Sequence, residues 1–233
     1  MKHTGMNNVH TGIRNVELIR AGMLKVNEIF FSIQGESTRS GLPTVFIRLT
    51  GCPLRCVYCD TAYAFHQGSN ISINDILRET GRYRTKYVTV TGGEPLAQKT
   101  CLDLLNQLCN EGYQVSLETG GALDISGVDM RVARIVDIKT PASGECEKNR
   151  LANLEYLTAH DQIKFVICDR MDYEWAREML RDRQLNGLCE VLFSPSHDQL
   201  DAKILADWIL VDQLPVRLQI QLHKYLWGDV PGK

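Results

Sequence analysis

Three cysteines lie close together between Gly51 and Asp60, and their spacing is the strongest chemical signal in the chain. Cys52, Cys56 and Cys59 form a C-x3-C-x2-C run within the stretch GCPLRCVYCD. Thiolates that converge in one tight loop bind soft metals, so an iron–sulfur cluster and zinc are the leading candidates. Structural zinc ions and iron–sulfur clusters are both usually held by four protein ligands. Three cysteines would leave one iron of a [4Fe-4S] cluster open to bind and activate a small molecule.

The three cysteines could also have a plainer role. They could be ordinary buried thiols, or part of a zinc site that is completed elsewhere in the chain. The stretch TGGEP at 91–95 favours the open cluster, because it follows an apolar, β-branched strand. Its two glycines let the backbone approach and hydrogen-bond a ligand. Glu94 could accept hydrogen bonds from an ammonium group, although a plain strand-to-helix turn would also account for this stretch.

The composition is ordinary for a soluble globular protein and favours a small-molecule partner. The chain has 233 residues, which suits one domain of the α/β barrel kind. Lys and Arg number 26 against 28 Asp and Glu, and no basic run stands out, so we expect no nucleic-acid partner. No apolar stretch approaches the roughly 20 residues of a membrane span, and the first residues lack the apolar region of a secretory signal. We therefore expect no membrane partner.

The cysteine content points to a reducing compartment. Eight cysteines, three of them clustered, indicate cofactor binding in a cytoplasmic protein rather than a disulfide framework. Four of the other five are expected to be buried small hydrophobic residues: Cys101, Cys109, Cys168 and Cys189. Cys146 lies in a polar loop, and its pattern gives no assignment.

The elements that must position these residues alternate between strands and helices. Strands are predicted at 25–33, 44–50, 87–91, 114–118, 135–138, 162–168, 189–193 and 216–222. Helices are predicted at 72–81, 97–111, 149–158, 172–184 and 199–211. This alternation is typical of parallel strands joined by crossover helices.

The fold prediction is an α/β partial (β/α) barrel of about six parallel core strands with an N-terminal strand extension. Residues 1–23 are weakly patterned and could form a mobile extension, with residues 24–233 as a single domain. Five strands end in polar or glycine-rich residues, at Cys52, Thr91, Glu118, Lys139 and Ser194. Ligands in parallel α/β folds bind at the carboxyl ends of the strands, so we expect one site at this rim.

The motifs together resemble a known enzyme superfamily. The three-cysteine run with Tyr58 before its last cysteine, followed by GGEP, resembles the radical S-adenosylmethionine superfamily. Further stretches across residues 25–227 are similar to the 7-carboxy-7-deazaguanine synthases. They are Val26–Phe30, Ile33–Glu36, Phe46–Arg48, Cys59–Thr61, Leu117–Gly121 and Gln221–Tyr225.

The resemblance implies a reaction and its cofactors. The family converts 6-carboxy-5,6,7,8-tetrahydropterin to 7-carboxy-7-deazaguanine with loss of ammonia, a carbon–nitrogen lyase step of queuosine and 7-deazapurine biosynthesis. It implies a [4Fe-4S] cluster on the three cysteines, S-adenosylmethionine chelated by the open iron, and Mg2+. One electron, from a donor such as flavodoxin or ferredoxin, then releases a 5′-deoxyadenosyl radical that takes a hydrogen atom from the substrate. A homodimer is implied as well.

The resemblance also implies three groups of site residues besides the cluster cysteines. Those that match substrate-binding positions are Ile33, Gln34, Gly35, Arg48, Thr91, Glu118 and His223. Those expected near S-adenosylmethionine are Tyr58, Cys59, Asp60, Gly93, Glu94, Asp137, Ile138, Lys139, Ser194, Pro195, Ser196 and His197. Thr61 is expected to supply an oxygen ligand to Mg2+ near the substrate carboxylate, although it could instead cap the loop. No acid or base is assigned, because the radical is generated at the cluster.

Several of these residues suit a small polar substrate. A pterin presents a guanine-like edge of two donors, which the carboxylate of Glu118 could accept together. Arg48 is a planar fork suited to a substrate carboxylate, although it could also be a surface arginine at a strand end. His223 could hydrogen-bond the substrate or have only a structural role. Glu36, beside Gln34, could help in hydrogen bonding or be a solvated turn residue.

The chain departs from the family pattern in two ways. Shorter members end just after the stretch that matches His223–Tyr225, and their terminal carboxylate joins the substrate site, whereas this chain continues to Lys233. Asp-Ile-Lys at 137–139 stands where Ser-Pro-Lys is common, so only Lys139 carries over cleanly. Two rival functions remain: a radical activating enzyme that acts on a protein partner, and a non-catalytic iron–sulfur or zinc-binding module.

Overall fold

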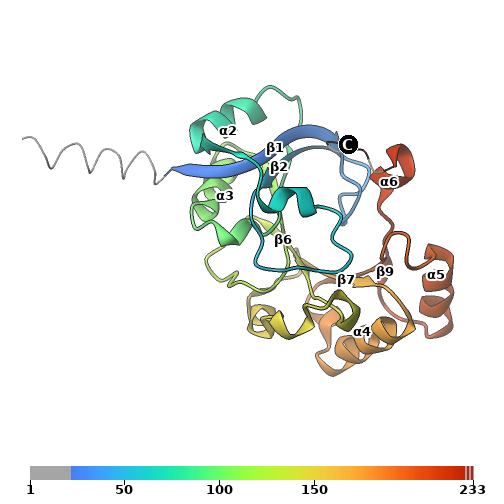
Figure 1. The fold of residues 1–233 in the computed structure, drawn as a ribbon. Helices are drawn as coiled ribbons and strands as arrows, with labels where there is room; N and C mark the ends of the chain where they lie inside the picture. The colour runs from blue at the N-terminus through green and yellow to red at the C-terminus, as the bar shows by residue number, and fades with distance from the viewer. Residues whose placement is uncertain (1–21, 229, 231, 233) are drawn as a thin grey trace, which may run out of the picture.

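The computed structural model describes residues 22–228, 230 and 232, and these contain one open sheet (Figure 1). The strand order is β3-β1-β2-β4-β5-β6-β7-β8-β9, with β3 (Ser69–Ser72) and β9 (Arg217–Leu218) at the two edges. β1 (Met23–Ile33) pairs antiparallel with β3 and with β2 (Pro43–Leu49). Every pairing from β2 onward is parallel, through β4 (Tyr87–Gly92), β5 (Gln114–Thr119), β6 (Ala133–Asp137), β7 (Gln162–Ile167) and β8 (Glu190–Pro195) to β9. The predicted partial barrel with an N-terminal strand extension is confirmed.

Five α-helices and six short 3-10 helices connect the described strands. The α-helices are α2 (Ile73–Thr80), α3 (Cys101–Asn110), α4 (Arg170–Asp182), α5 (Ala202–Val211) and α6 (Leu222–Trp227). The 3-10 helices are η1 (Ala62–Phe65), η2 (Pro95–Ala97), η3 (Pro141–Ser143), η4 (Cys146–Lys148), η5 (Leu151–Tyr156) and η6 (Leu185–Gly187). Figure 1 shows α2 and α3 beside the first half of the sheet and α4 and α5 beside the second half. None of the helices in the described part of the chain is long and apolar enough to cross a membrane.

Most of the predicted elements are present, and their ends follow from side-chain caps. The hydroxyl of Ser72 accepts a hydrogen bond from the backbone of Asp75 at 3.1 Å and starts α2. Asp169 and Asp201 cap α4 and α5 in the same way, so these helices begin at residues 170 and 202. The predicted extension of residues 1–23 lies outside the described residues except for its last two, and Met23 already pairs with Ser72 in the sheet.

Two predictions of secondary structure are wrong. The segment predicted as a helix at 149–158 contains the 3-10 helix η5, because the buried side chain of Asn153 is tied to the neighbouring loop by hydrogen bonds to the carbonyl groups of Gly121 and Leu123. The strand predicted at 216–222 is only β9, at the open edge of the sheet, and the chain then forms α6. β3 and α6 were not predicted, since both are short and carry weak patterns.

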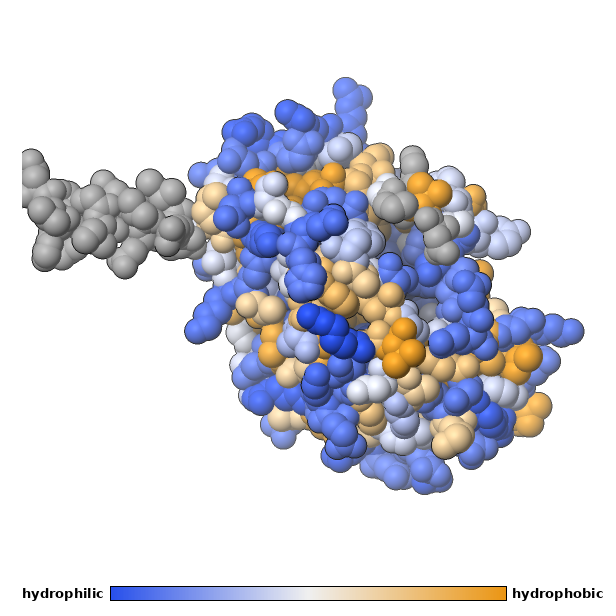
Figure 2. Space-filling model, viewed as in Figure 1, coloured by the Kyte–Doolittle hydropathy of each residue, from blue (hydrophilic) through white to orange (hydrophobic). Residues whose placement is uncertain are grey.

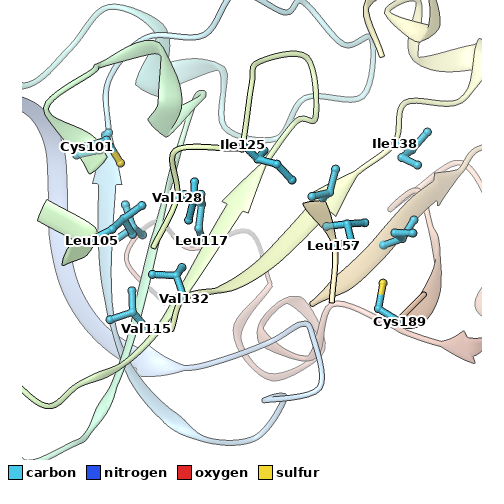
Figure 3. Packing of buried hydrophobic residues seen from close by; sticks show 14 of the residues in the cluster. Cys101, Leu105, Val115, Leu117, Ile125, Val128, Val132, Ile138, Leu157 and Cys189 are labelled. Carbon is cyan, nitrogen blue, oxygen red and sulfur yellow. The ribbon is translucent and has the colours of Figure 1, made fainter. Parts of the chain in front are cut away.

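The hydrophobic core lies between the sheet and its helices. Strand residues alternate between this core and the opposite, concave face, because successive side chains of a strand point to opposite sides. Figure 3 shows Cys101 and Leu105 of α3 packing near Val115 and Leu117 of β5. Cys101 and Cys189 are buried as predicted, whereas Cys109, Cys146 and Cys168 are only partly so.

A buried ion pair joins β6 to the turn before β7. The guanidinium of Arg134 donates to both oxygens of Asp161, at 3.0 and 2.6 Å, and the two side chains are 4 % and 0 % exposed. Burial opposes ionisation of Asp161, but the hydrogen bonds from Arg134 and Thr158 outweigh it and lower its pKa. The carboxylate therefore contributes stability above the pKa of an unfolded aspartate, and this contribution is lost as the pH falls.

We expect Asp161→Asn to lower the free energy of unfolding by about 3 kcal/mol at neutral pH, because Arg134 keeps a buried charge without its partner. The measurement is urea denaturation of the protein without cofactors. Asp182→Asn is the matched control, since the ion pair of Asp182 with Arg181 is exposed and contributes less than about 1 kcal/mol. Equal unfolding free energies for the two variants would contradict the role of the buried pair.

Candidate active site

A cavity of about 540 Å³ lies on the concave face of the sheet, at the carboxyl ends of the parallel strands. Seven neighbouring strands, β1 to β8 without β3, line it, and the loops after β1, β2 and β8 and the start of α6 complete its wall. Of the predicted site residues it brings together Ile33, Gln34, Arg48, Cys52, Cys56, Tyr58, Cys59, Asp60, Thr61, Thr91, Gly93, Glu118, Asp137, Lys139, Ser194, Pro195, Ser196, His197 and His223. The expectation of one site at the strand ends therefore holds for these residues.

Three predicted site residues do not line the cavity. Ile138 is buried in the hydrophobic core. The carboxylate of Glu94 is fully buried and accepts hydrogen bonds from the backbone of Leu96 and Gly120 and from the hydroxyl of Thr119, at 2.8 to 3.0 Å. Three of the acceptor positions of Glu94 are thus used by its own chain, and its carboxylate braces the ends of β4 and β5.

Gly35, the third of these residues, matters because it has no side chain. A Cβ atom at this position would lie 2.0 Å from Nδ1 of His223. The carbonyl group of Gly35 also accepts a hydrogen bond from the backbone of Leu222 at 3.0 Å. Glycine therefore lets α6 approach closely and places His223 at the cavity. Burial lowers the pKa of His223, which keeps its imidazole neutral at neutral pH.

The cysteine loop is held in place by the loop after β6. The carboxylate of Glu145 accepts the backbone N–H of Arg55 at 2.6 Å, and the carbonyl group of Ser143 accepts that of Val57 at 3.0 Å. These bonds fix the backbone between the cysteines. In Figure 1 the loop after β2, in teal, crosses the middle of the view.

The three cysteines of the run line one cavity. A [4Fe-4S] cluster takes each cysteine on a different iron, so three cysteines in one cavity wall fit such a cluster. Burial raises the pKa of Cys52 and Cys56, and the positive charge of bound iron would favour their thiolates.

Beside the cysteines, two buried polar atoms point to a ligand. The hydroxyl of Tyr58 and Oδ1 of Asp137 have no hydrogen-bond partner among the described residues. Buried polar groups are nearly always hydrogen-bonded, so such orphans in a cavity wall suit a polar ligand. Lys139 lies 3.0 Å from the other oxygen of Asp137 and 5.7 Å from the centre of the Tyr58 ring. This part of the cavity wall therefore offers both charged and unpartnered polar groups to a ligand.

The opposite end holds a carboxylate between two neutral donors. Glu118 accepts hydrogen bonds from the amide of Gln34 at 3.3 Å and from the hydroxyl of Thr91 at 2.9 Å. Burial and the nearby charge of Glu36 raise the pKa of Glu118, and Lys164 and Thr91 act in the opposite direction. An ionised carboxylate has about four acceptor positions, so two remain free for a ligand.

The side chain of Arg48 is held in place on the cavity wall next to this carboxylate. Its Nε donates to Glu28 at 2.7 Å, and Glu28 also accepts the hydroxyl of Tyr63 at 2.8 Å. The guanidinium lies 5.6 Å from the centre of the Phe30 ring, which stacks on Phe46 at 4.9 Å. Because only Nε is used in this ion pair, the Nη groups can still receive a ligand carboxylate.

Thr61 and Asp60 form an oxygen-rich corner beside the cysteines. The hydroxyl of Thr61 donates to Oδ1 of Asp60 at 2.9 Å, and Lys224 lies 3.2 Å from Oδ2. Burial opposes ionisation of Asp60, but Lys224 and Thr61 outweigh it and lower its pKa to about 2. The carboxylate of Asp60 is therefore ionised and paired with Lys224, and both residues line the cavity together with Thr61.

Several residues of the cavity wall were not predicted from the sequence, and Lys164 is the most informative of them. Lys164 interrupts an apolar strand, QIKFVI, in which Ile163, Phe165 and Ile167 face the core. A charged residue in the middle of a buried parallel strand was a usable signal. Phe30, Phe46, Gln221 and Lys224 also line the cavity, and their patterns gave no such signal.

Comparison with known proteins agrees with this geometry. A model of the Radical SAM superfamily matches residues 46–139. A 7-carboxy-7-deazaguanine synthase of Chlorobaculum tepidum is 44 % identical over 208 residues, which cover 88 % of this chain and 94 % of the relative. The synthase of Koribacter versatilis is 43 % identical over 219 residues, with 88 % and 97 % coverage. The chain belongs to the 7-carboxy-7-deazaguanine synthase family.

Solved structures share the fold. The crystal structure of QueE from Escherichia coli matches with a TM-score of 0.72 at 24 % identity and covers 88 % of this chain and 98 % of that one. Streptococcus suis SuiB bound to its precursor peptide SuiA matches with a TM-score of 0.59 at 15 % identity, over 94 % of this chain and 55 % of that one. The family membership predicted from the motifs is confirmed. Membership of the radical S-adenosylmethionine superfamily implies a [4Fe-4S] cluster and S-adenosylmethionine as cofactors.

We expect Cys56→Ala to abolish assembly of the [4Fe-4S] cluster, because three sulfurs are the fewest that can hold it with one open iron. Iron content and visible absorbance after anaerobic reconstitution measure the loss. Cys146→Ala, a partly buried cysteine outside the run, is the control and should assemble a full cluster. Full cluster absorbance in Cys56→Ala would contradict the assignment.

Proposed function

We propose that this enzyme is a carbon–nitrogen lyase that converts 6-carboxy-5,6,7,8-tetrahydropterin to 7-carboxy-7-deazaguanine with loss of ammonia, in queuosine and 7-deazapurine synthesis. The observation that carries the proposal is the pairing of an open three-cysteine loop with a recessed carboxylate, Glu118, in one cavity. When bound, the cluster and S-adenosylmethionine supply a 5′-deoxyadenosyl radical that takes a hydrogen atom from the substrate.

In this proposal, Glu118 recognises the guanine-like edge of the pterin. Its free acceptor positions take two N–H donors of that edge, while Gln34 and Thr91 hold the carboxylate in place. A bidentate, charge-assisted pair of this kind fixes orientation as well as affinity. The ring is thereby held so that its reacting carbon faces the cluster side of the cavity.

Arg48 binds the substrate carboxylate at the other side of the ring. The ion pair with Glu28 and the aromatic stack beneath fix its guanidinium before the substrate arrives. Neutral His223 supplies a further hydrogen bond, because Gly35 allows it to reach the wall of the cavity. Positioning of the bound ring is the main contribution of these side chains to the rate.

The orphan atoms of Tyr58 and Asp137 would bind S-adenosylmethionine in this cavity. Ser194, Ser196 and Gly93 line the same cavity. A Cβ at Gly93 would lie 2.3 Å from the carbonyl oxygen of Gly51, so glycine is needed for β4 to end against the cysteine loop. The backbone N–H of Glu94 donates to that carbonyl oxygen at 2.7 Å, which holds the strand end against the cysteine loop.

Mg2+ completes the proposed site at Thr61. Mg2+ keeps several waters and binds few protein ligands, so one hydroxyl with the substrate carboxylate and the neighbouring charge of Asp60 is sufficient. We also propose that a small one-electron donor such as flavodoxin or ferredoxin reduces the cluster and that the enzyme acts as a homodimer. Val57, between two cluster cysteines, is 73 % exposed and would be reachable for such a donor.

The second candidate is a radical activating enzyme that acts on a protein. The recessed Glu118 and the neighbouring Arg48 favour a small polar substrate. On the face in Figure 2, apolar residues are interspersed with polar ones instead of forming one continuous docking surface. The first candidate is therefore better supported.

The decisive assay is anaerobic conversion. The reconstituted, reduced enzyme is given S-adenosylmethionine, Mg2+ and 6-carboxytetrahydropterin, and 7-carboxy-7-deazaguanine is sought by mass spectrometry. Product that depends on both pterin and reductant supports the proposal. Formation of 5′-deoxyadenosine without deazaguanine would refute the substrate assignment and favour the activating enzyme. Failure to cleave S-adenosylmethionine at all would favour a non-catalytic module.

We expect Glu118→Gln to weaken pterin binding by about 2 kcal/mol, or roughly thirtyfold, while the cluster assembles normally. An amide offers one acceptor and two donors, so it can no longer take both N–H groups of the edge. Equilibrium binding to the oxidised enzyme measures the change. Glu111→Gln, on the exposed end of α3, is the control. Unchanged pterin affinity in Glu118→Gln would count against its role.

We expect Thr61→Ala to raise the Mg2+ concentration needed for half-maximal activity by about tenfold, because a protein ligand is lost. Thr61→Ser keeps the hydroxyl and should behave like the unmodified enzyme. Titration of activity with Mg2+ for the three proteins tests this. Identical Mg2+ titration curves for the three proteins would show that Thr61 is not a Mg2+ ligand and makes only its hydrogen bond to Asp60.

A further inference from the structure

Lys164 is a buried ammonium on the concave face of β7, and none of the roles described above uses it. It lines the cavity and its side chain is 14 % exposed. Its ammonium donates to one carboxylate oxygen of Glu36, and the other oxygen of Glu36 accepts the amide of Gln221 at 2.8 Å. Lys164 also stands opposite Asp137 in the sheet register, so it lies between the two ends of the cavity.

Glu36 connects this ammonium to the carboxylate of Glu118. The backbone N–H of Glu36 donates to the amide oxygen of Gln34 at 3.1 Å, and the amide nitrogen of Gln34 donates to Glu118 at 3.3 Å. Two carboxylates, Glu36 and Glu118, thus lie close together in one partly buried corner of the cavity. Like charges in such a site raise each other's pKa, so one of the two protonates unless a cation lies beside them.

Other charges around this corner are already engaged or lie farther along the wall. Arg48 is paired with Glu28, and Lys139 is paired with Asp137. The titratable and charged groups that face the corner from the surrounding elements are Glu36, Arg48, Tyr58, Asp60, Glu118, Asp137, Lys139, Lys164, His223 and Lys224. Within this set Lys164 donates directly to Glu36.

We propose that Lys164 is a positioning residue that holds Glu36 and Glu118 as two anions, so that Glu118 presents an ionised carboxylate to the substrate. The inference rests on the proposed function and names a further determinant of its specificity. An ionised Glu118 accepts two N–H donors and selects a guanine-like edge, whereas a protonated one would donate and select a different edge. Burial and the charge of Glu36 oppose this ionisation and raise the pKa of Glu118, and the ammonium of Lys164 reduces that rise.

Substitutions at Lys164 separate its charge from its hydrogen bond. Lys164→Gln keeps a donor for Glu36 and removes the charge, whereas Lys164→Arg keeps the charge. In Lys164→Gln the pKa of the glutamate pair rises, so the anionic form exists only at higher pH and is lost as the pH falls. Pterin affinity of Lys164→Gln should therefore be about tenfold weaker near neutral pH and should approach that of the unmodified enzyme at a pH of about 9.

The test is equilibrium binding of 6-carboxytetrahydropterin, over a pH series, to enzyme that carries the oxidised cluster and therefore cannot turn over. Lys164→Arg should bind with the flat pH profile of the unmodified enzyme, and Lys203→Met, on the exposed start of α5, is the surface control. The proposal is overturned if Lys164→Gln folds and its pterin affinity depends on pH in the same way as that of the unmodified enzyme. Lys164→Met serves as the second variant if the glutamine variant does not fold.

A measurement without pterin separates this proposal from the function itself. Infrared spectra of ligand-free Lys164→Gln at neutral pH should show the signal of a protonated carboxyl group. The spectrum of Lys164→Arg should lack this signal. The double variant Lys164→Gln, Glu118→Gln should lack it as well. Absence of this signal from folded Lys164→Gln refutes the role of Lys164 even if the enzyme makes deazaguanine. If the unmodified enzyme binds no pterin, the proposed function fails while the infrared test still decides the charge of the pair.

Discussion

The two-residue period of the parallel strands is the constraint on which the site depends. In β2, Val45, Ile47 and Leu49 face the helices, and the residues between them, Phe46 and Arg48, face the cavity. The same alternation in the other parallel strands covers one face with helices and leaves the concave face polar. Because the strands are parallel, their carboxyl ends meet at one rim, and the loops that carry the cysteines and glycines start there.

A polar concave face creates an electrostatic problem that the fold solves by pairing. Charges removed from water are costly unless each has a partner and its remaining hydrogen bonds are satisfied. Arg48 with Glu28, Lys139 with Asp137 and Lys164 with Glu36 are pairs of this kind. Glu118 differs, because its direct partners are neutral donors, and it therefore keeps acceptor capacity for a ligand.

The cysteine loop depends on the rest of the chain as much as on its own sequence. Its backbone is bonded to residues 143–145, about 90 positions later, through Ser143 and Glu145. Gly93 lets β4 end directly against the loop, and Glu94 ties β4 to the end of β5. Cluster, strand ends and substrate pocket are consequently parts of one braced unit.

The sequence by itself determined the chemistry: the spacing of Cys52, Cys56 and Cys59, the glycines after β4 and the alternation of strands and helices are local signals. It could also locate Arg48 and Glu118, since they lie at or near strand ends. Only the tertiary structure decided the network, because a contact such as Lys164 with Glu36 joins residues 128 positions apart. The structure also replaced the helix predicted at 149–158 by a 3-10 helix, where the buried Asn153 binds a distant loop. It further showed that Glu94 ties the ends of two strands together. Those outcomes depend on long-range packing and hydrogen bonding, which no local pattern encodes.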